Sequence, residues 1–171
     1  MMYYSGRGDN GYTDLKGERV RKDCPAIELI GELDKLAAHI GLALSEIVDK
    51  EIRETLEEVE RHIYLISAKV SGFITKEKEK ELEKDLVAFI EEKTNYFGSK
   101  IPDISKFVKP NGSKAATLLN VCRTLARECE RTAIKEYPEV QIIKYLNRLS
   151  SLLFVLFRYQ NMLDGYKEEY Y

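Results

Sequence analysis

The amino-acid sequence predicts an all-α protein: an up-and-down bundle of about five helices that follows an N-terminal glycine-rich loop. Three observations favour this class. Apolar residues recur at spacings of three and four along successive segments, which is the period of helices that bury one face. No strand-like alternation or internal repeat is visible. The composition, 44% hydrophobic and 33% charged over 171 residues, fits one globular domain with its own core.

The first two predicted helices span about residues 26–48 and 50–73. Asp23 and Pro25 provide a start signal for the first, and Gly72 lies near the end of the second. The core stripe of the first helix consists of Leu29, Leu33, Leu36, Ile40 and Ile47, widened by Ile27, Ile30, Ala37 and Leu44. The second helix has the spacing of a bundle seam at Leu56, Val59, Ile63, Ile66 and Val70.

The third predicted helix spans about residues 76–97, with Thr75 as its cap and a solvated charge run in its first half. Its buried face is expected at Leu82, Leu86 and Phe89. The segment that follows, GSKIPDISKFVKPNGS, contains two prolines and two glycines, which exclude a continuous helix. We therefore expect a loop before the fourth helix.

The fourth and fifth predicted helices span about residues 114–136 and 139–162, and Tyr137-Pro138 separates them. The expected core stripe of the fourth is Leu118, Cys122, Leu125 and Cys129. The fifth is apolar around nearly its whole circumference between 146 and 157, so it is either central in the bundle or covered by another subunit. We favour a homo-oligomer, with the central position as a close alternative. The tail, 164–171, is predicted to be mobile.

Charge and composition exclude several classes of function. The net charge of -2 gives no overall attraction to nucleic acid, so any basic site is local. The longest apolar run, residues 152–157, is too short to span a membrane, and the polar first residues do not resemble a signal peptide. Cys122 and Cys129 lie in a helical pattern and are expected to be reduced core thiols, which favours a cytoplasmic protein without a membrane partner.

The fourth predicted helix carries a polar face, formed by Asn120, Arg123, Arg127 and Glu130, with Arg131 beside them. Such a face is commonly a solvated surface with ion pairs. Because guanidinium groups match phosphate oxygens with paired donors, the alternative is a clamp for an oxyanion. The sequence alone leaves both interpretations open.

Asp34 lies among the small residues Gly31, Ala38 and Gly41 on the first predicted helix. A carboxylate at a close approach of helices or subunits needs a basic partner, for which Arg123 is a candidate. A solvated boundary position is the alternative. On the fifth helix Asn147 interrupts an apolar pattern. It is either a nucleotide contact or an ordinary polar residue at the boundary of the helix's apolar face.

Two loops hold further candidates. Phe107, between Lys106 and Lys109, either fills the core or contacts a ligand. The N-terminal segment has glycines that allow close approach of backbone amides, and it has basic residues around them. It is not a Walker A loop, which needs the pattern G-x-x-x-x-G-K-[ST] before a helix. The glycines of the N-terminal segment are Gly6, Gly8 and Gly11, and its basic residues are Arg7, Arg19, Arg21 and Lys22.

The order of five motifs resembles the PduO-type ATP:cob(I)alamin adenosyltransferases. They are YSGRGDNGYT, GERVRKDCPAIELIGELDKLAAHIG, FVKPNG, CRTLARECER and YLNRLSSLLFVLFRYQN. The resemblance covers most of the chain and is weakest between about Asp49 and Ile104. It implies a ferritin-like five-helix bundle, a homotrimer with active sites between subunits, and transfer of the adenosyl group of ATP to the cobalt of cobalamin. Triphosphate is the implied leaving group, and magnesium is the implied cation.

Positions that match the family's motifs imply which residues of this chain form the site. The resemblance implies that residues 1–24 form an ATP-wrapping loop, residues 25–163 the bundle and residues 164–171 a tail, all in one domain. The implied ATP-binding residues are Ser5, Gly6, Arg7, Gly8, Thr13, Asp14, Lys22, Arg127, Glu130, Arg131 and Asn147. Arg123 matches the residue that pairs with the Asp34 position across subunits. Phe107 matches the aromatic that covers the lower face of the corrin and keeps the dimethylbenzimidazole base off cobalt.

The implied chemistry suits these residue types. Cobalt(I) is already a strong nucleophile, so the site needs alignment and charge stabilisation instead of a base. Arg127, Lys22 and magnesium would neutralise the leaving triphosphate. An apolar Phe107 cannot coordinate cobalt, so displacing the lower ligand makes cobalt(II) easier to reduce.

The chain departs from the family pattern at a few positions. Ser5 stands where threonine is usual, and Gly6 stands where a basic residue is usual, so the positive charge moves to Arg7. Asn111-Gly112 replaces a double glycine, and Ala37 replaces a common polar residue. None of these changes removes the main arginines, so we still expect activity.

Two other classes of helical protein are alternatives to the transferase. In a non-catalytic helical interaction module the arginine face would be merely solvated. A ferritin-like dimetal protein needs glutamate three residues before histidine, and neither His39 nor His62 has one.

Overall fold

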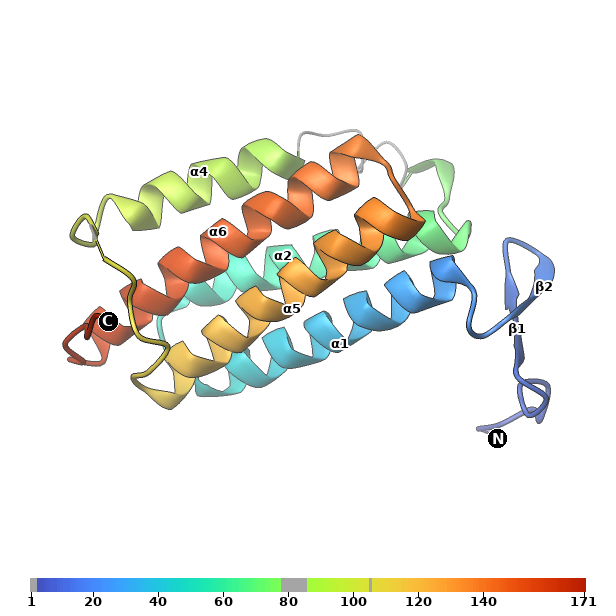
Figure 1. Ribbon diagram of the computed structural model, residues 1–171, viewed down its shortest axis with the longest axis horizontal. Coiled ribbons are helices and arrows are strands. Elements are labelled where there is room, and N and C mark those ends of the chain that lie inside the picture. Colours follow the sequence, from blue (N-terminus) through green and yellow to red (C-terminus); the bar gives the residue numbers. More distant parts are fainter. Residues whose placement is uncertain (1–2, 78–85, 105) are drawn as a thin grey trace.

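The computed structural model describes residues 3–77, 86–104 and 106–171, and within these ranges five helices form an elongated bundle (Figure 1). They are α1 (Pro25–Glu46), α2 (Lys50–Ser71), α4 (Leu86–Gly98), α5 (Lys114–Glu136) and α6 (Val140–Leu163). The helical prediction is therefore confirmed. The described part of the third predicted helix is α4, and Leu82 lies outside the described residues.

Local signals set the ends of these helices. Pro25 occupies the first turn of α1, and the residue before it, Cys24, makes no side-chain cap. The Asp49 carboxylate caps α2 by accepting a hydrogen bond from the backbone N–H of Ile52 at 2.9 Å. Gly72 ends α2 in the left-handed region, at a φ of 73°. The Ser113 hydroxyl caps α5 by accepting from the N–H of Ala116 at 3.1 Å.

The core stripes of α1 and α2 are those that the sequence predicts, whereas the stripe of α5 is rotated. Leu118 and Leu125 are only partly buried at its edges. The buried centre of α5 is mostly small: Ala115, Ala116, Leu119, Cys122, Ala126, Cys129 and Ala133. Small residues allow α1 and α6 to pack closely on α5 from two sides.

Both helical cysteines fit the prediction of core thiols. Cys122 and Cys129 are free and have no exposed surface. Burial raises the pKa of each thiol to about 12, so neither is a reactive thiolate near neutral pH.

Helix α6 lies in the middle of the bundle, packed between α4 and α5 (Figure 1). Its apolar circumference is thus used within one chain, and the argument for a homo-oligomer from this helix loses its force. By length and composition α6 is also apolar enough to cross a membrane, but half of the relevant window is buried inside the protein. A core helix has this composition for the same reason.

The prediction that the chain has no strands is wrong for its N-terminal segment. Strands β1 (Tyr12–Leu15) and β2 (Glu18–Arg21) form an antiparallel hairpin. Its two-residue turn is Lys16-Gly17, with φ values of 52° and 80°. Positive φ at both positions matches the twist of a tight hairpin. A four-residue strand is too short to show a clear alternating pattern. In the sequence, the Lys-Gly pair of the turn is therefore the feature that could have indicated a hairpin.

The C-terminal tail is also ordered, contrary to the prediction that it is mobile. Tyr170 forms an antiparallel bridge with Val108 in the loop between α4 and α5. The backbone N–H of Lys109 donates to the carbonyl of Glu169 at 2.8 Å, and the N–H of Tyr171 donates to that of Phe107 at 3.1 Å. The tail and this loop therefore hold each other at one end of the bundle (Figure 1).

Candidate active site

The polar face of α5 presents three arginines, at Arg123, Arg127 and Arg131. Arg127 and Arg131 are exposed, and Arg123 is half-buried. Among residues 3–77, 86–104 and 106–171 no carboxylate lies within ion-pair distance of any of the three. Burial, followed by the charge of Arg127, lowers the pKa of Arg123. The face therefore carries more positive than negative charge, and its arginines make no ion pair within the described residues.

Glu130 and Asn147 lie beside these arginines and contact each other. The Asn147 side-chain amide donates to Glu130 Oε1 at 2.8 Å and connects α6 to α5. The same amide's oxygen accepts from Arg148 at 2.7 Å, and Arg148 donates in turn to Glu91 of α4 at 3.0 Å. The structure thus brings together two residues that the sequence assigns to the ATP site. Arg148 and Glu91, which complete this chain of contacts, were missed, because nothing in their spacing marks them.

Asp34 is exposed on α1, and it makes no ion pair with Arg123 within the described part of the chain. The adjacent Lys35 instead pairs with Glu128 of α5 at 3.1 Å, which fixes the register of α1 against α5. Gly31, Ala38 and Gly41 are exposed on α1 as well. The outer face of α1 is therefore open in the single chain.

The N-terminal segment folds on itself. Arg7 pairs with Asp14 of β1 at 3.1 Å, and Arg19 of β2 approaches the same carboxylate at 3.5 Å. The Lys22 ammonium lies so close to Gly8 that an added Cβ there would be 2.9 Å from it. Each of these charged groups lies on or next to the hairpin. The remaining predicted residues of this segment are Ser5, whose hydroxyl accepts from the N–H of Arg7 at 3.4 Å, Gly6, whose φ is 68°, and Thr13, paired with Val20.

This segment extends beyond the N-terminal end of α1, away from the helices (Figure 1). Its connection to the bundle is at the hairpin turn, where the N–H of Lys16 donates to the carbonyl of Ser71 at 3.1 Å. Lys16 also approaches the ring of Tyr137, and Leu15 is buried. Within the described ranges no hydrogen bond or ion pair joins the segment to the arginines of α5.

The loop between α4 and α5 lies at the end of the bundle opposite the N-terminal segment (Figure 1), and Phe107 belongs to this loop. Its side chain is 86% exposed, so it does not fill the core. Of the two interpretations left open by the sequence, the core-filling one is wrong, and the ligand contact stays a prediction.

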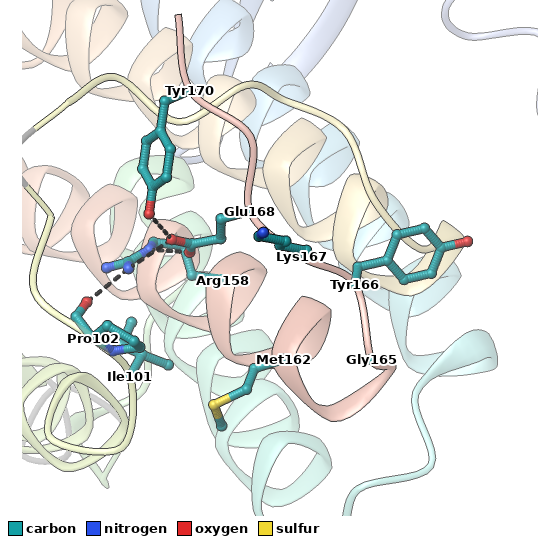
Figure 2. A pocket seen from close by; sticks show the side chains of 9 residues that line it. All are labelled: Ile101, Pro102, Arg158, Met162, Gly165, Tyr166, Lys167, Glu168 and Tyr170. Atoms are coloured by element: carbon teal, nitrogen blue, oxygen red, sulfur yellow. Dashed lines mark hydrogen bonds and ion pairs between the residues drawn. The ribbon is translucent and has the colours of Figure 1, made fainter.

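A cavity of about 380 Å³ lies at this end, below the tail (Figure 2). It is lined by Ile101, Pro102, Arg158, Met162, Gly165, Tyr166, Lys167, Glu168 and Tyr170. Arg158 of α6 is buried here and faces Glu168. It therefore does not contribute to the site at α5.

Comparison with known proteins identifies the family and the fold of this chain. Residues 3–160 match the family model described as cobalamin adenosyltransferase. A corrinoid adenosyltransferase of Bacillus subtilis is 32% identical, and the match covers 96% of this chain and 89% of that protein. The chain belongs to the cobalamin adenosyltransferase family. A cobalamin adenosyltransferase of Cupriavidus metallidurans is 33% identical over 92% of the chain and 87% of its own length.

Solved structures agree with this family over the whole chain. A PduO-type ATP:corrinoid adenosyltransferase from Lactobacillus reuteri has a TM-score of 0.88 at 25% identity and covers 99% of both chains. That structure is a phenylalanine-to-alanine variant complexed with cobalamin and ATP. An arginine-to-lysine variant from the same organism, complexed with ATP, has a TM-score of 0.87 at 26% identity. The PduO-type resemblance read from the motifs is confirmed.

The described residues of this family member do not form a metal site of their own. No group of three or more His, Cys, Asp or Glu side chains in those ranges is arranged to hold an ion. The rival interpretation as a dimetal protein therefore gains no support from the part of the chain that is described.

Proposed function

We propose that this protein transfers the adenosyl group of ATP to the cobalt of a reduced corrinoid and releases triphosphate. Membership of the cobalamin adenosyltransferase family supports the reaction. The structural observation that carries it is the unpaired arginine face of α5 beside the contact between Glu130 and Asn147. A cluster of guanidinium groups without carboxylate partners suits a polyanion whose negative charge increases during the reaction.

In this proposal the arginine face binds the triphosphate end of ATP. Arg127 is exposed and lies close enough to Arg123 to lower its pKa, so a phosphate placed between them would relieve their mutual repulsion. Asn147 and Glu130 hold polar atoms of the nucleoside. The N-terminal segment supplies Lys22, Arg7 and backbone amides around Gly6 and Gly8.

Phe107 takes the lower face of the corrin. Cobalt(I) attacks the ribose carbon and forms a cobalt–carbon bond, while the carbon–oxygen bond to triphosphate breaks and its electron pair leaves with the phosphate. No general base is required for this step. The exposed ring of Phe107 offers an apolar group where a coordinating base would otherwise bind, and cobalt(II) without that ligand is reduced more easily.

We further propose that the site forms between subunits of a homotrimer. Arg127 is 13 residues beyond Lys114, the first residue of α5, or about 20 Å along the helix at about 1.5 Å per residue. Phe107 precedes that helix, so one chain holds the two halves of the site far apart. The open face of α1 around Asp34 supplies a surface on which a second copy can place Arg123.

This arrangement predicts that Asp34→Arg and Arg123→Asp are each inactive, because each leaves two like charges at one interface. The double variant should recover part of the activity and the oligomer, as measured by adenosylation assay and light scattering. Failure of the double variant to recover, with both single variants trimeric, would contradict the cross-subunit pair.

Magnesium is proposed to arrive with ATP. Among the described residues no group of three or more His, Cys, Asp or Glu side chains could hold it. A cytoplasmic location is proposed on the same basis as at the sequence level, since free thiols and a reduced corrinoid both suit a reducing compartment.

The direct test is a spectrophotometric assay of cob(I)alamin loss on addition of ATP and magnesium. We expect adenosylcobalamin and triphosphate in equal amounts. If cob(I)alamin persists while ATP is bound, the transferase reaction is refuted. If calorimetry with magnesium-ATP also shows no heat, the non-catalytic interaction module becomes the better description.

A further inference from the structure

We propose that Arg158 and Glu168 are positioning residues for Phe107: their buried ion pair fixes the tail, and the tail fixes the Phe107 strap, residues 106–109. The inference rests on the proposed function, in which Phe107 covers the corrin. The ion pair does not touch the corrin or ATP, and it affects the reaction only through the position of Phe107.

The tail supplies the backbone hydrogen bonds of the strap, and Val108 packs against the hydrophobic core as well. The Phe107 side chain is 86% exposed and contributes almost no packing. Two backbone hydrogen bonds flank the bridge between Val108 and Tyr170: Lys109 N–H to Glu169 O at 2.8 Å and Tyr171 N–H to Phe107 O at 3.1 Å. Residues 107–109 and 169–171 therefore form a short antiparallel pair. Because the carbonyl of Phe107 itself is bound, this pairing fixes the backbone of Phe107 and so the direction in which its Cα–Cβ bond leaves the strap.

The largely buried carboxylate of Glu168 collects several of the contacts that hold the tail. Glu168 receives hydrogen bonds from Arg158 Nε at 2.5 Å and from Arg158 Nη2 at 3.0 Å, in the two-point geometry that guanidinium and carboxylate groups favour (Figure 2). The Tyr170 hydroxyl donates to the same carboxylate at 2.8 Å. The side chains of Arg158 and Glu168 are only 5% and 17% exposed. This pair is screened far less than a surface ion pair is.

Arg158 also binds the loop itself. Its Nη2 donates to the carbonyl of Pro102 at 2.7 Å (Figure 2). At the other end of the loop, Asn161 donates to the carbonyl of Asn111 at 3.0 Å and accepts from the N–H of Ser113 at 3.0 Å. These two residues lie three positions apart on α6, so one helix face fixes both ends of the loop while the tail fixes its middle.

Apolar packing does not replace this ion pair. Three tyrosines of the tail, Tyr166, Tyr170 and Tyr171, are exposed, and the space beneath the tail is the cavity of about 380 Å³ instead of a filled core. Burial would raise the pKa of Glu168, yet the hydrogen bonds from Arg158 and Tyr170 bring it below its ordinary value. The carboxylate therefore stays ionised and bound at neutral pH.

The consequence for catalysis is specific. A strap that moves by an ångström still leaves the arginine face and ATP untouched, but it no longer excludes the lower base from cobalt. Loss of the ion pair should therefore slow adenosylation that begins from cobalt(II), where the base must be displaced before reduction. Adenosylation of cobalt(I) that has been reduced beforehand should be nearly unaffected.

The experiment compares Glu168→Ala with Lys167→Gln in the full-length protein. Lys167 is the neighbouring charged residue of the same tail, and it lines the same cavity. For Glu168→Ala we expect the rate from cob(II)alamin with a mild reductant to fall about tenfold, because a misplaced positioning group slows the reaction. The rate from cob(I)alamin should change less than about twofold. Lys167→Gln should match the unmodified protein in both assays.

Two further measurements keep the inference open to refutation. With cob(II)alamin and ATP bound, electron paramagnetic resonance should show the nitrogen splitting of a coordinated base in Glu168→Ala and not in the unmodified protein. Glu168→Gln, which retains one acceptor for Arg158, should lie between the two. Thermal unfolding of each variant shows whether the bundle is intact.

A double variant decides whether the effect passes through Phe107. In a Phe107→Ala background, Glu168→Ala should cause no further loss, because there is no ring left to position. Additive losses, or equal losses from both cobalt states, would overturn the positioning role. If the unmodified protein adenosylates neither state, the proposed function fails instead, and the two failures are thus distinguishable.

Discussion

Two segments of this protein lie outside the helices, one at each end of the bundle, and they are attached in different ways (Figure 1). The Phe107 strap is held by backbone pairing, a buried ion pair and an asparagine of α6. The N-terminal segment is bound to the bundle mainly at its hairpin turn, through Lys16 and Leu15. One chain therefore holds the proposed corrin-facing strap by several contacts and leaves the proposed ATP-facing segment with few contacts to the bundle.

The difference indicates which contacts order each half of the proposed site. The strap is positioned before any ligand binds, so little ordering entropy is lost when a corrin arrives. The N-terminal segment keeps its charges on itself, as in the pair of Arg7 with Asp14. Its remaining contacts are proposed to form with ATP or with a neighbouring subunit.

The largest expected effect lies between the two segments, at Arg127. We expect Arg127→Ala to lower the rate of adenosylation about a hundredfold from either cobalt state, as loss of charge stabilisation in a transition state does. Stopped-flow measurement of cob(I)alamin loss gives the rate. A rate within twofold of the unmodified protein would show that Arg127 does not contact the triphosphate.

The next effect separates the strap from the rest of the site. Phe107→Ala should lower the rate from cob(II)alamin about tenfold more than the rate from cob(I)alamin. Phe107 is exposed and packs on nothing, so the unfolding temperature should stay the same. Equal loss in both assays would show that the ring does not act by displacing the lower base.

At the N-terminal segment the effect should appear in ATP binding. Lys22→Ala should raise the KM for ATP about fivefold with little change in kcat, because an exposed ammonium contributes a screened interaction with phosphate. Arg21→Ala is the matched control, since the Arg21 guanidinium is already bound to Asp23 at 2.7 Å. Similar changes in both variants would indicate a general charge effect instead of a specific contact.

The smallest effect concerns the docking of the hairpin. At Gly72 φ is 73°, and an added Cβ would overlap the side chain of Lys16. Gly72→Ala should therefore destabilise the protein by about 1 kcal/mol and lower the unfolding temperature by about 2–4 °C. Calorimetry measures this change. An unaltered melting temperature would show that neither the positive φ nor the contact with Lys16 carries a cost at this position.

The separate residues of the candidate site were predictable to different degrees. Arg123, Arg127, Glu130 and Arg131 were visible on one face of a predicted helix, because helical spacing fixes which side chains share a face. The contact between Glu130 and Asn147 was implied only by the family resemblance, since it joins two helices. Glu168 could not be found at all, because its importance depends on Arg158 being buried opposite it.

The sequence by itself determined the helices, their order and most of the core, because the 3.6-residue period and the capping signals are local properties of the chain. Tertiary structure alone decided that α6 is central, that the N-terminal segment is a hairpin and that the tail is bound to the Phe107 strap. These features depend on contacts between residues far apart in the chain, and the free energy of such a contact depends on burial and partners that no local pattern records.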